Sequence, residues 1–317
     1  YNGSDNETTF DVEKIDSIIT IDTIGSVDAN SNVNVTGILV DSAQNAISNQ
    51  EVTITVNNKK YTTTTDNEGK YVVTIMTSLV SGNYDVSASY AGSDVYTMAS
   101  AQTSMFVKEE TSIIAEGPIS ATVNSTITIN GSLMDTSDNG IANATITVTF
   151  EGKDYTTTTN DDGKFTCDIM TTTVGDNIPV TVRYDGNDTY MASSEIINVD
   201  VEKLGSELTL NPVNNTSINS TVDVSGVLSE EYTQKAIANS TVTIIVDGIS
   251  YNTVTDDSGN FKVTIKAAAT TGTYTIKASY DGSDLYTPSS DETTFDVEKI
   301  SSSITIDAIG NVDANSN

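Results

Sequence analysis

The sequence predicts an all-β protein built as a series of two-layer sandwiches, and three observations support this. Apolar residues recur at every second position in short runs, which is the period of a half-buried strand. The runs are rich in Val, Ile, Thr and Tyr, residues that favour strands. Gly, Asn and Asp separate the runs, as they do in turns. No segment shows a convincing helical periodicity.

The chain repeats itself, and the repeat predicts how many sandwiches it contains. The segment ETTFDVEK at 7–14 recurs at 292–299, an offset of 285 residues (292 minus 7). Aligned without a gap, residues 1–32 and 286–317 are identical at 24 of 32 positions. Between these copies, the last strands of successive units are expected to end near 14, 109, 203 and 299. Each unit therefore holds roughly 95 residues, the size of one immunoglobulin-type sandwich.

These ends divide the chain into units. We expect the end of a preceding repeat, three complete repeats and the first strand of a following repeat, at residues 1–14, 15–109, 110–203, 204–299 and 300–317. The junctions at 12–15, 201–204 and 297–300 contain no Gly or Pro. The last strand of one unit is therefore expected to run almost directly into the first strand of the next, with the units arranged end to end.

Each unit is predicted to contain seven short strands. In the first complete unit the period-two segments lie at 17–22, 32–40, 51–56, 60–65, 70–75, 84–90 and 103–107. Alternate residues of these segments, such as Val52, Ile54 and Val56, are expected to point into the core. Seven strands of this length in one unit favour tandem seven-stranded immunoglobulin-like β-sandwiches.

A turn recurs at the same place in each unit. Its glycines, Gly69, Gly163 and Gly259, are expected to adopt a positive φ. The Asp residues two or three positions earlier are expected to accept hydrogen bonds from N–H groups of the turn.

Tyr84 and Tyr274 begin the next strand in their units. They are candidates for a tyrosine corner, although Ile178 stands at the matching place in the middle unit. A half-buried core residue with a solvated hydroxyl is the alternative.

Composition argues against several functions. A net charge of −30 repels phosphate backbones and anionic lipids, so neither nucleic-acid binding nor docking to a membrane surface is expected. No apolar run is long enough to insert into a membrane. One Cys and no His rule out a disulfide within this sequence and a His/Cys zinc site. Cys167 falls on an inward row and is expected to be a small buried apolar residue.

Catalysis is not expected either, and we predict no catalytic or cofactor-binding residue. General acid–base catalysis usually uses His, or paired carboxylates in a cleft. Here the carboxylates are scattered over turns and outward strand positions. Ser and Thr are abundant but lack an activating base.

The order of the motifs resembles a known family. In the first unit it comprises V-x-I-x-V at 52–56, T-D-x-x-G-x-Y at 65–71, G-x-Y-x-V-x-A-x-Y at 82–90 and Y-x-G-x-x-x-Y at 90–96. Over essentially its whole length the chain resembles the immunoglobulin-like repeats of bacterial and archaeal cell-surface proteins, most closely the adhesin-like proteins of methanogenic archaea. The resemblance implies an extracellular, cell-surface stalk without catalytic residues.

The expected function is a structural stalk or fibre of a cell-surface adhesin-like protein, which projects or links an adhesive element. Its partners would be neighbouring repeats of the same chain, like chains in a fibre and an unknown surface ligand. Two alternatives stay open: a ligand-binding module that engages a glycan or protein on another cell, and a virion-associated fibre. A binding module predicts exposed aromatic residues in the loops of one unit. Tyr96, Tyr190 and Tyr286 recur in every unit, which favours structure.

Acid-rich turns offer the hard oxygen ligands that calcium prefers. The candidate ligands are Asp161, Asp162, Asp256, Asp257, Asp281 and Asp284. None of them follows the ligand order of an EF-hand loop, so solvated turn acids are the favoured interpretation. No other cofactor is expected.

Asn-x-Ser/Thr sequons are the clearest modification signal. The candidate glycosylation sites are Asn34, Asn124, Asn130, Asn143, Asn187, Asn219 and Asn239. Further sequons begin at Asn2, Asn6, Asn214 and Asn215. Asn143 and Asn239 share one loop position in their units, where a glycosylating enzyme could reach them.

The end-to-end arrangement can be tested by small-angle scattering on the recombinant chain. Three units in a row predict a radius of gyration above roughly 30 Å, whereas one compact globule of this length would give about 20 Å. A value near the smaller figure would mean that the units pack side by side, which contradicts a stalk.

Overall fold

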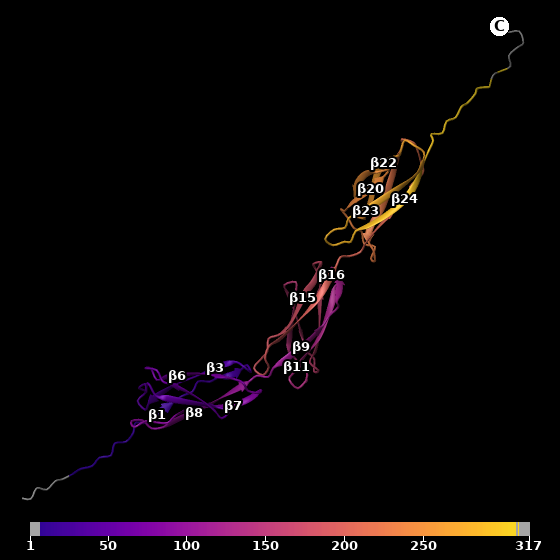
Figure 1. Cartoon of the computed structure of the whole chain (residues 1–317). Coiled ribbons are helices and arrows are strands. Elements are labelled where there is room, and N and C mark those ends of the chain that lie inside the picture. Colours follow the sequence, from indigo (N-terminus) through magenta and orange to yellow (C-terminus); the bar gives the residue numbers. More distant parts are fainter. Residues whose placement is uncertain (1–6, 309, 311–317) are drawn as a thin grey trace, which may run out of the picture. The chain divides into compact units, whose positions relative to one another are not determined.

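The computed structural model describes residues 7–308 and 310. In these ranges the regular elements are 24 strands, and no helix occurs. The strands form three sandwiches that follow one another along the chain, each with two sheets (Figure 1). The predicted fold class, tandem immunoglobulin-like sandwiches, is confirmed.

The three sandwiches contain corresponding strands. The first consists of β1 (Ser17–Ile19), β2 (Gly25–Val27), β3 (Asn32–Asp41), β4 (Glu51–Val56), β5 (Lys59–Thr64), β6 (Lys70–Met76), β7 (Gly82–Tyr90) and β8 (Ala99–Val107). The second consists of β9 (Thr111–Glu116), β10 (Ser120–Thr122), β11 (Thr126–Asp135), β12 (Thr145–Phe150), β13 (Lys153–Thr158), β14 (Lys164–Met170), β15 (Gly175–Tyr184) and β16 (Ser193–Glu202). The third consists of β17 (Ser206–Leu210), β18 (Thr216–Ser217), β19 (Thr221–Glu230), β20 (Thr241–Val246), β21 (Ile249–Val254), β22 (Asn260–Lys266), β23 (Gly272–Tyr280) and β24 (Ser289–Glu298).

Each sandwich pairs a three-stranded sheet with a five-stranded sheet. In the first, the orders are β1-β3-β6 and β2-β8-β7-β4-β5, and the other two sandwiches repeat them. Each sandwich has eight strands and not the seven predicted, because the first predicted strand, 17–22, is shorter than expected and is followed by a second short segment, β2, which joins the other sheet. In the first sandwich Gly25 has a φ of 74° at the start of β2. In the second and third, Pro118 and Pro212 lie between the two segments and lack the N–H that a continuous ladder needs.

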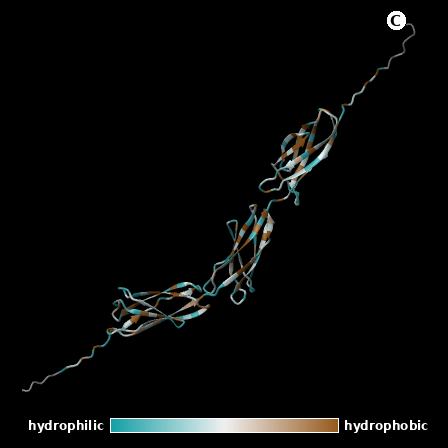
Figure 2. Ribbon diagram, in the orientation of Figure 1, coloured by the Kyte–Doolittle hydropathy of each residue, from teal (hydrophilic) through white to brown (hydrophobic). Residues whose placement is uncertain are grey.

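The cores lie between the two sheets and are built from the alternate residues of the strands. Val52, Ile54 and Val56 are buried, as predicted. Figure 2 shows hydrophobic residues along the strands of each sandwich. Cys167 is buried and free, and burial raises the pKa of its thiol, which makes the thiolate scarce.

The recurring turn before β6, β14 and β22 has the predicted geometry. Gly69, Gly163 and Gly259 have φ values of 73°, 74° and 77°. In the third sandwich Asp256 Oδ1 accepts hydrogen bonds from the N–H groups of Ser258 and Asn260, both at 2.9 Å. A second reason for glycine could not be foreseen: a Cβ at Gly69 would lie 2.4 Å from the carbonyl oxygen of Leu39. The turn packs against a strand of its own sandwich too closely for any side chain.

Two sandwiches contain the tyrosine corner. The hydroxyl of Tyr84 donates to the carbonyl of Val80 at 3.0 Å, and that of Tyr274 donates to the carbonyl of Thr270 at 3.1 Å. Each bond ties the first part of β7 or β23 to the loop four residues upstream.

The segments outside the sandwiches form no strand where the structure describes them, at 7–14 and 300–308. Residues 1–6, 309 and 311–317, which belong to the predicted neighbouring repeats, lie outside the described residues. The assignment of 1–14 and 300–317 to neighbouring repeats therefore stays a prediction.

Tyr90 and Tyr280 occupy the same core position in the first and third sandwiches, but their hydroxyl groups differ in hydrogen bonding. The hydroxyl of Tyr90 donates to Gln50 Oε1 at 2.9 Å. The residue corresponding to Gln50 is Ser240, and the Tyr280 hydroxyl is buried without a hydrogen-bond partner.

We expect Tyr90→Phe to lower the free energy of unfolding of the first sandwich by about 1 kcal/mol, because it breaks a hydrogen bond and leaves the Gln50 amide oxygen without its donor. Tyr280→Phe should leave the third sandwich unchanged or stabilise it, since it removes only an unpaired hydroxyl. Urea denaturation of the single variants would measure both effects. Equal losses would contradict the assigned hydrogen bonding.

Candidate functional site

The residue that enters each sandwich is held by a loop about 80 residues later in the chain. In the first sandwich, Ile15 N donates to the carbonyl of Val95, and Thr97 N donates to the carbonyl of Ile15, both at 2.9 Å. Ile15 and Tyr96 thereby form an isolated parallel bridge. We call this pair of hydrogen bonds the entry clamp.

The other two sandwiches contain the same clamp. Glu109 bridges Tyr190, with hydrogen bonds of 2.9 and 2.7 Å, and Leu204 bridges Tyr286, with two of 2.9 Å. The entry residue is aliphatic at Ile15 and Leu204 but acidic at Glu109, and the bonds of the clamp are made by backbone groups. A repeat can therefore vary its entry residue without losing the clamp.

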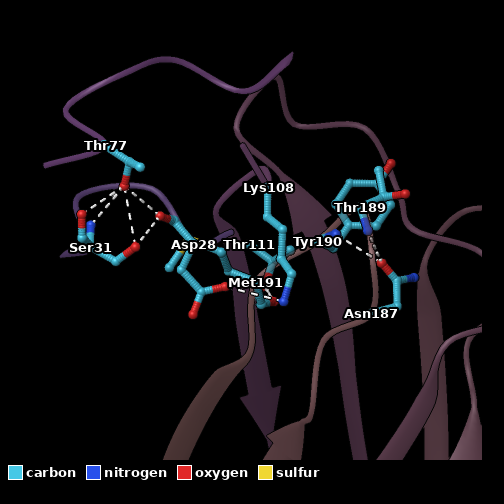
Figure 3. A network of polar contacts seen from close by, with 9 residues as sticks. All are labelled: Asp28, Ser31, Thr77, Lys108, Thr111, Asn187, Thr189, Tyr190 and Met191. Carbon is cyan, nitrogen blue, oxygen red and sulfur yellow. Dashed lines mark hydrogen bonds and ion pairs between the residues drawn. The ribbon is translucent and has the colours of Figure 1, made fainter. Parts of the chain in front are cut away.

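Side chains shape the loop that provides the clamp. In the second sandwich, Asn187 Oδ1 accepts hydrogen bonds from Thr189 N at 2.7 Å and Tyr190 N at 2.8 Å (Figure 3). Ser93 and Ser283 provide the corresponding acceptor in the other two sandwiches. The loop that precedes the last strand is thus held in the shape that receives the entering chain.

The next contact along the chain is the parallel pairing of the second short strand with the last strand. In the first sandwich β2 pairs with β8 in the register Gly25 to Met105 and Val27 to Val107. The N–H of Lys108 extends the ladder by donating to Val27 O at 2.8 Å. β10 with β16 and β18 with β24 pair in the same parallel sense. We call this the closing ladder.

A buried threonine holds the segment that follows the closing ladder. Thr77 Oγ1 lies 2.8 Å from the carbonyl oxygen of Asp28 and accepts a hydrogen bond from Ser31 N at 3.0 Å (Figure 3). Lys108 Nζ lies 3.2 Å from Asp28 Oδ1 and adds an ion pair at the same place. Thr171 repeats the threonine contacts in the second sandwich. Ala267 stands at the corresponding place in the third sandwich, where this hydroxyl is missing.

The acidic calcium candidates are exposed in their turns. The Asp256 carboxylate accepts backbone hydrogen bonds, chiefly from Asn260, and these lower its pKa. In the second sandwich Asn160 fills this capping place, so Asp161 and Asp162 lie on the turn surface. Among the described residues, no group of three or more His, Cys, Asp or Glu could hold a metal ion. The structure does not bring the six candidates together, and calcium binding stays a prediction.

The glycosylation candidates within the described chain are exposed. Asn34 and Asn130 lie on strands β3 and β11, and Asn34 Oδ1 accepts a hydrogen bond from Thr74 Oγ1 at 2.7 Å. Left-handed φ values of 61°, 56°, 62° and 52° occur at Asn124, Asn143, Asn219 and Asn239. Asn2 and Asn6 lie outside the described residues.

The sequence analysis did not predict one exposed aromatic residue in a loop, Tyr232. Tyr96, Tyr190 and Tyr286, the recurring loop tyrosines, are half-buried, whereas Tyr232 in the third sandwich is 87% exposed. The available signal was a difference in length. The segment that contains Tyr232 has one residue more than the matching segments of the other units.

A family model described as the carboxypeptidase regulatory-like domain matches residues 128–221. A comparison with curated proteins finds no match. Solved structures that are similar include a bacterial ice-binding adhesin, with 18% identity, 91% of this chain and 100% of that chain covered, and a TM-score of 0.31. Invasin, described as a bacterial integrin-binding protein, has 19% identity, with 90% of this chain and 60% of that chain covered and a TM-score of 0.40. An I-band fragment of titin has 13% identity, with 89% of this chain and 99% of that chain covered and a TM-score of 0.38. At these identities and TM-scores the similarities indicate no function.

A search of the described residues for a helix long and apolar enough to cross a membrane finds none.

If the native protein is exported by a cell that N-glycosylates, we expect glycan on Asn143 and Asn239, because both side chains are exposed between strands. Asn49 occupies the same loop position with a φ of 52° but lacks a sequon, so it should stay unmodified. Intact-peptide mass spectrometry of native material can read all three. Bare Asn143 and Asn239 would argue against export or against accessibility of this loop.

Proposed function

We propose that this chain is a load-bearing stalk segment of an extracellular, cell-surface adhesin-like protein, and that it carries tension between an anchored end and an adhesive element. The observation that carries the proposal is the closing ladder, which recurs in all three sandwiches. Supporting features are the entry clamp in each sandwich and the order of the sequence motifs.

The parallel sense of the closing ladder determines how a sandwich responds to tension. Chain enters the ladder at the start of β2 and leaves it at the end of β8, and in a parallel pair these points lie at opposite ends. Tension on the chain therefore shears the two strands past one another and loads all of their hydrogen bonds together. An antiparallel pair pulled from adjacent ends would instead lose its bonds one after another.

The other contacts delay the same step. β2 cannot slide along β8 until the segment 28–31 leaves Thr77 and Lys108. The entry clamp first has to release Ile15 from the loop around Tyr96. The third sandwich, with a two-residue β18 and Ala267 in place of the threonine, offers the least resistance.

The proposal can be tested by pulling single molecules of the full chain from its two ends. We expect one unfolding event per sandwich and the lowest force for the third. Thr77→Ala should lower the unfolding force of the first sandwich, and Ala267→Thr should raise that of the third.

Thr65→Ala is the matched control. Thr65 Oγ1 is buried and donates to the carbonyl of Ile47 at 2.7 Å in the same sandwich, away from the closing ladder. It should cost a similar ~1 kcal/mol of equilibrium stability without lowering the unfolding force. Equal effects of Thr65→Ala and Thr77→Ala on force would contradict a load-bearing closing ladder.

A ligand-binding module is the second candidate, and the exposed Tyr232 favours it.

A further inference from the structure

The loop between β19 and β20 in the third sandwich differs from its counterparts. We call residues 230–236 the Tyr232 loop. Its flanking bridge joins Ser229 to Ala236, seven residues apart, whereas the corresponding bridges, Val40 to Ala46 and Met134 to Gly140, span six. The extra residue changes the loop in one repeat of three, while the sheets around it are the same.

Hydrogen bonds hold the base of the Tyr232 loop. The Glu230 carboxylate, in a residue only 7% exposed, accepts from the Tyr286 hydroxyl at 3.0 Å and from the Thr233 hydroxyl. The burial of Tyr286 and its bond to this carboxylate raise the tyrosine pKa to about 12. Glu230 therefore has donors around it that stay protonated at neutral pH.

Further bonds connect the loop to the start of the third sandwich. Gln234 Nε2 donates to Glu207 Oε2 at 3.0 Å and to the carbonyl of Glu231 at 2.9 Å. Glu231 N donates to the carbonyl of Gly205 at 3.0 Å. The Glu231 carboxylate lies beside Gly205, where a Cβ would be 2.4 Å from Glu231 Oε2. These bonds attach both ends of the loop to its own sandwich.

Tyr232 projects from this held loop with 87% of its surface exposed. An aromatic ring on a preorganised loop loses little conformational entropy on binding, which is why tyrosine is frequent in recognition loops. The carboxylates of Glu207 and Glu231, both exposed, lie at the same end of the sandwich. Lys235 is directed toward Glu230, with 3.9 Å between Nζ and Oε1.

We propose that the Tyr232 loop is a recognition site for a cationic side chain of a protein partner, best an arginine. The guanidinium group would stack on the Tyr232 ring and pair with the carboxylate of Glu231. An arginine fits both features because it is planar and always charged. The site belongs to the third sandwich alone, so it adds a specific contact to a chain whose other two units lack this loop.

The test is a titration of the full, isotope-labelled chain with a short Gly/Arg peptide, followed by backbone amide chemical shifts. A second peptide with citrulline in place of each arginine has the same shape without the charge. We expect the arginine peptide to shift amides at 205–207 and 230–236, and the citrulline peptide to shift them little. Tyr232→Ala should weaken the interaction by about threefold, the effect of one exposed cation–π contact.

A charge-matched control separates this site from general attraction to an acidic chain. Glu231→Gln and Asp138→Asn each remove one negative charge, the second from the matching loop of the second sandwich. Only Glu231→Gln should weaken binding. Equal weakening by both, shifts spread over all acidic loops, or an unchanged affinity of folded Tyr232→Ala would overturn the proposal. Binding of a neutral oligosaccharide at Tyr232 with an inert arginine peptide would overturn it as well.

Discussion

The parallel ladder between the second short strand and the last strand is the contact on which each sandwich depends. It joins residues near the start of a unit to residues near its end, as Val27 joins Val107. Without it the larger sheet would end at β8, and the segment after β1 would have no strand with which to pair. Because chain enters and leaves at opposite ends of this ladder, the contact that closes the fold is also the one that tension would shear in the proposed stalk.

Three copies of one sandwich in a single chain show which contacts recur and which vary. The closing ladder and entry clamp are made by backbone groups and occur in all three sandwiches. Side-chain contacts vary around them: Thr77 and Thr171 give way to Ala267, and Gln50 gives way to Ser240. These exchanges leave the topology of the unit unchanged, because the backbone pairing stays complete.

The loops have more freedom than the sheets, and the proposed specific function lies there. A sheet position must match its neighbours on both sides, whereas a loop must only connect two fixed ends. The Tyr232 loop uses that freedom to add one residue and expose an aromatic ring, while Glu230 is held against Tyr286 beneath it. A stalk with one distinctive loop can carry load through all its units and make specific contact through one.

Much of the fold could be predicted from the sequence because its signals are local. Period-two rows predicted the buried Val52, Ile54 and Val56, and turn chemistry predicted the positive φ of Gly69. The split of the first strand was missed, since the sheet that a short segment joins depends on partners far along the chain, as Val27 pairs with Val107. The exposed Tyr232 was missed because a one-residue difference in loop length does not reveal how a side chain points.

The segment ETTFDVEK separates what sequence alone determined from what tertiary structure decided. At 292–299 its Phe295 is 2% exposed in β24, whereas at 7–14 the identical residues form no strand and Phe10 is 83% exposed. Alternation made the segment able to form a strand with one apolar face. Whether it does so depends on β23, which supplies the backbone partners, and on the facing sheet, which covers the phenylalanine. A strand cannot satisfy its own N–H and C=O groups, so its sequence sets which face is apolar and only the assembled sandwich makes it a strand.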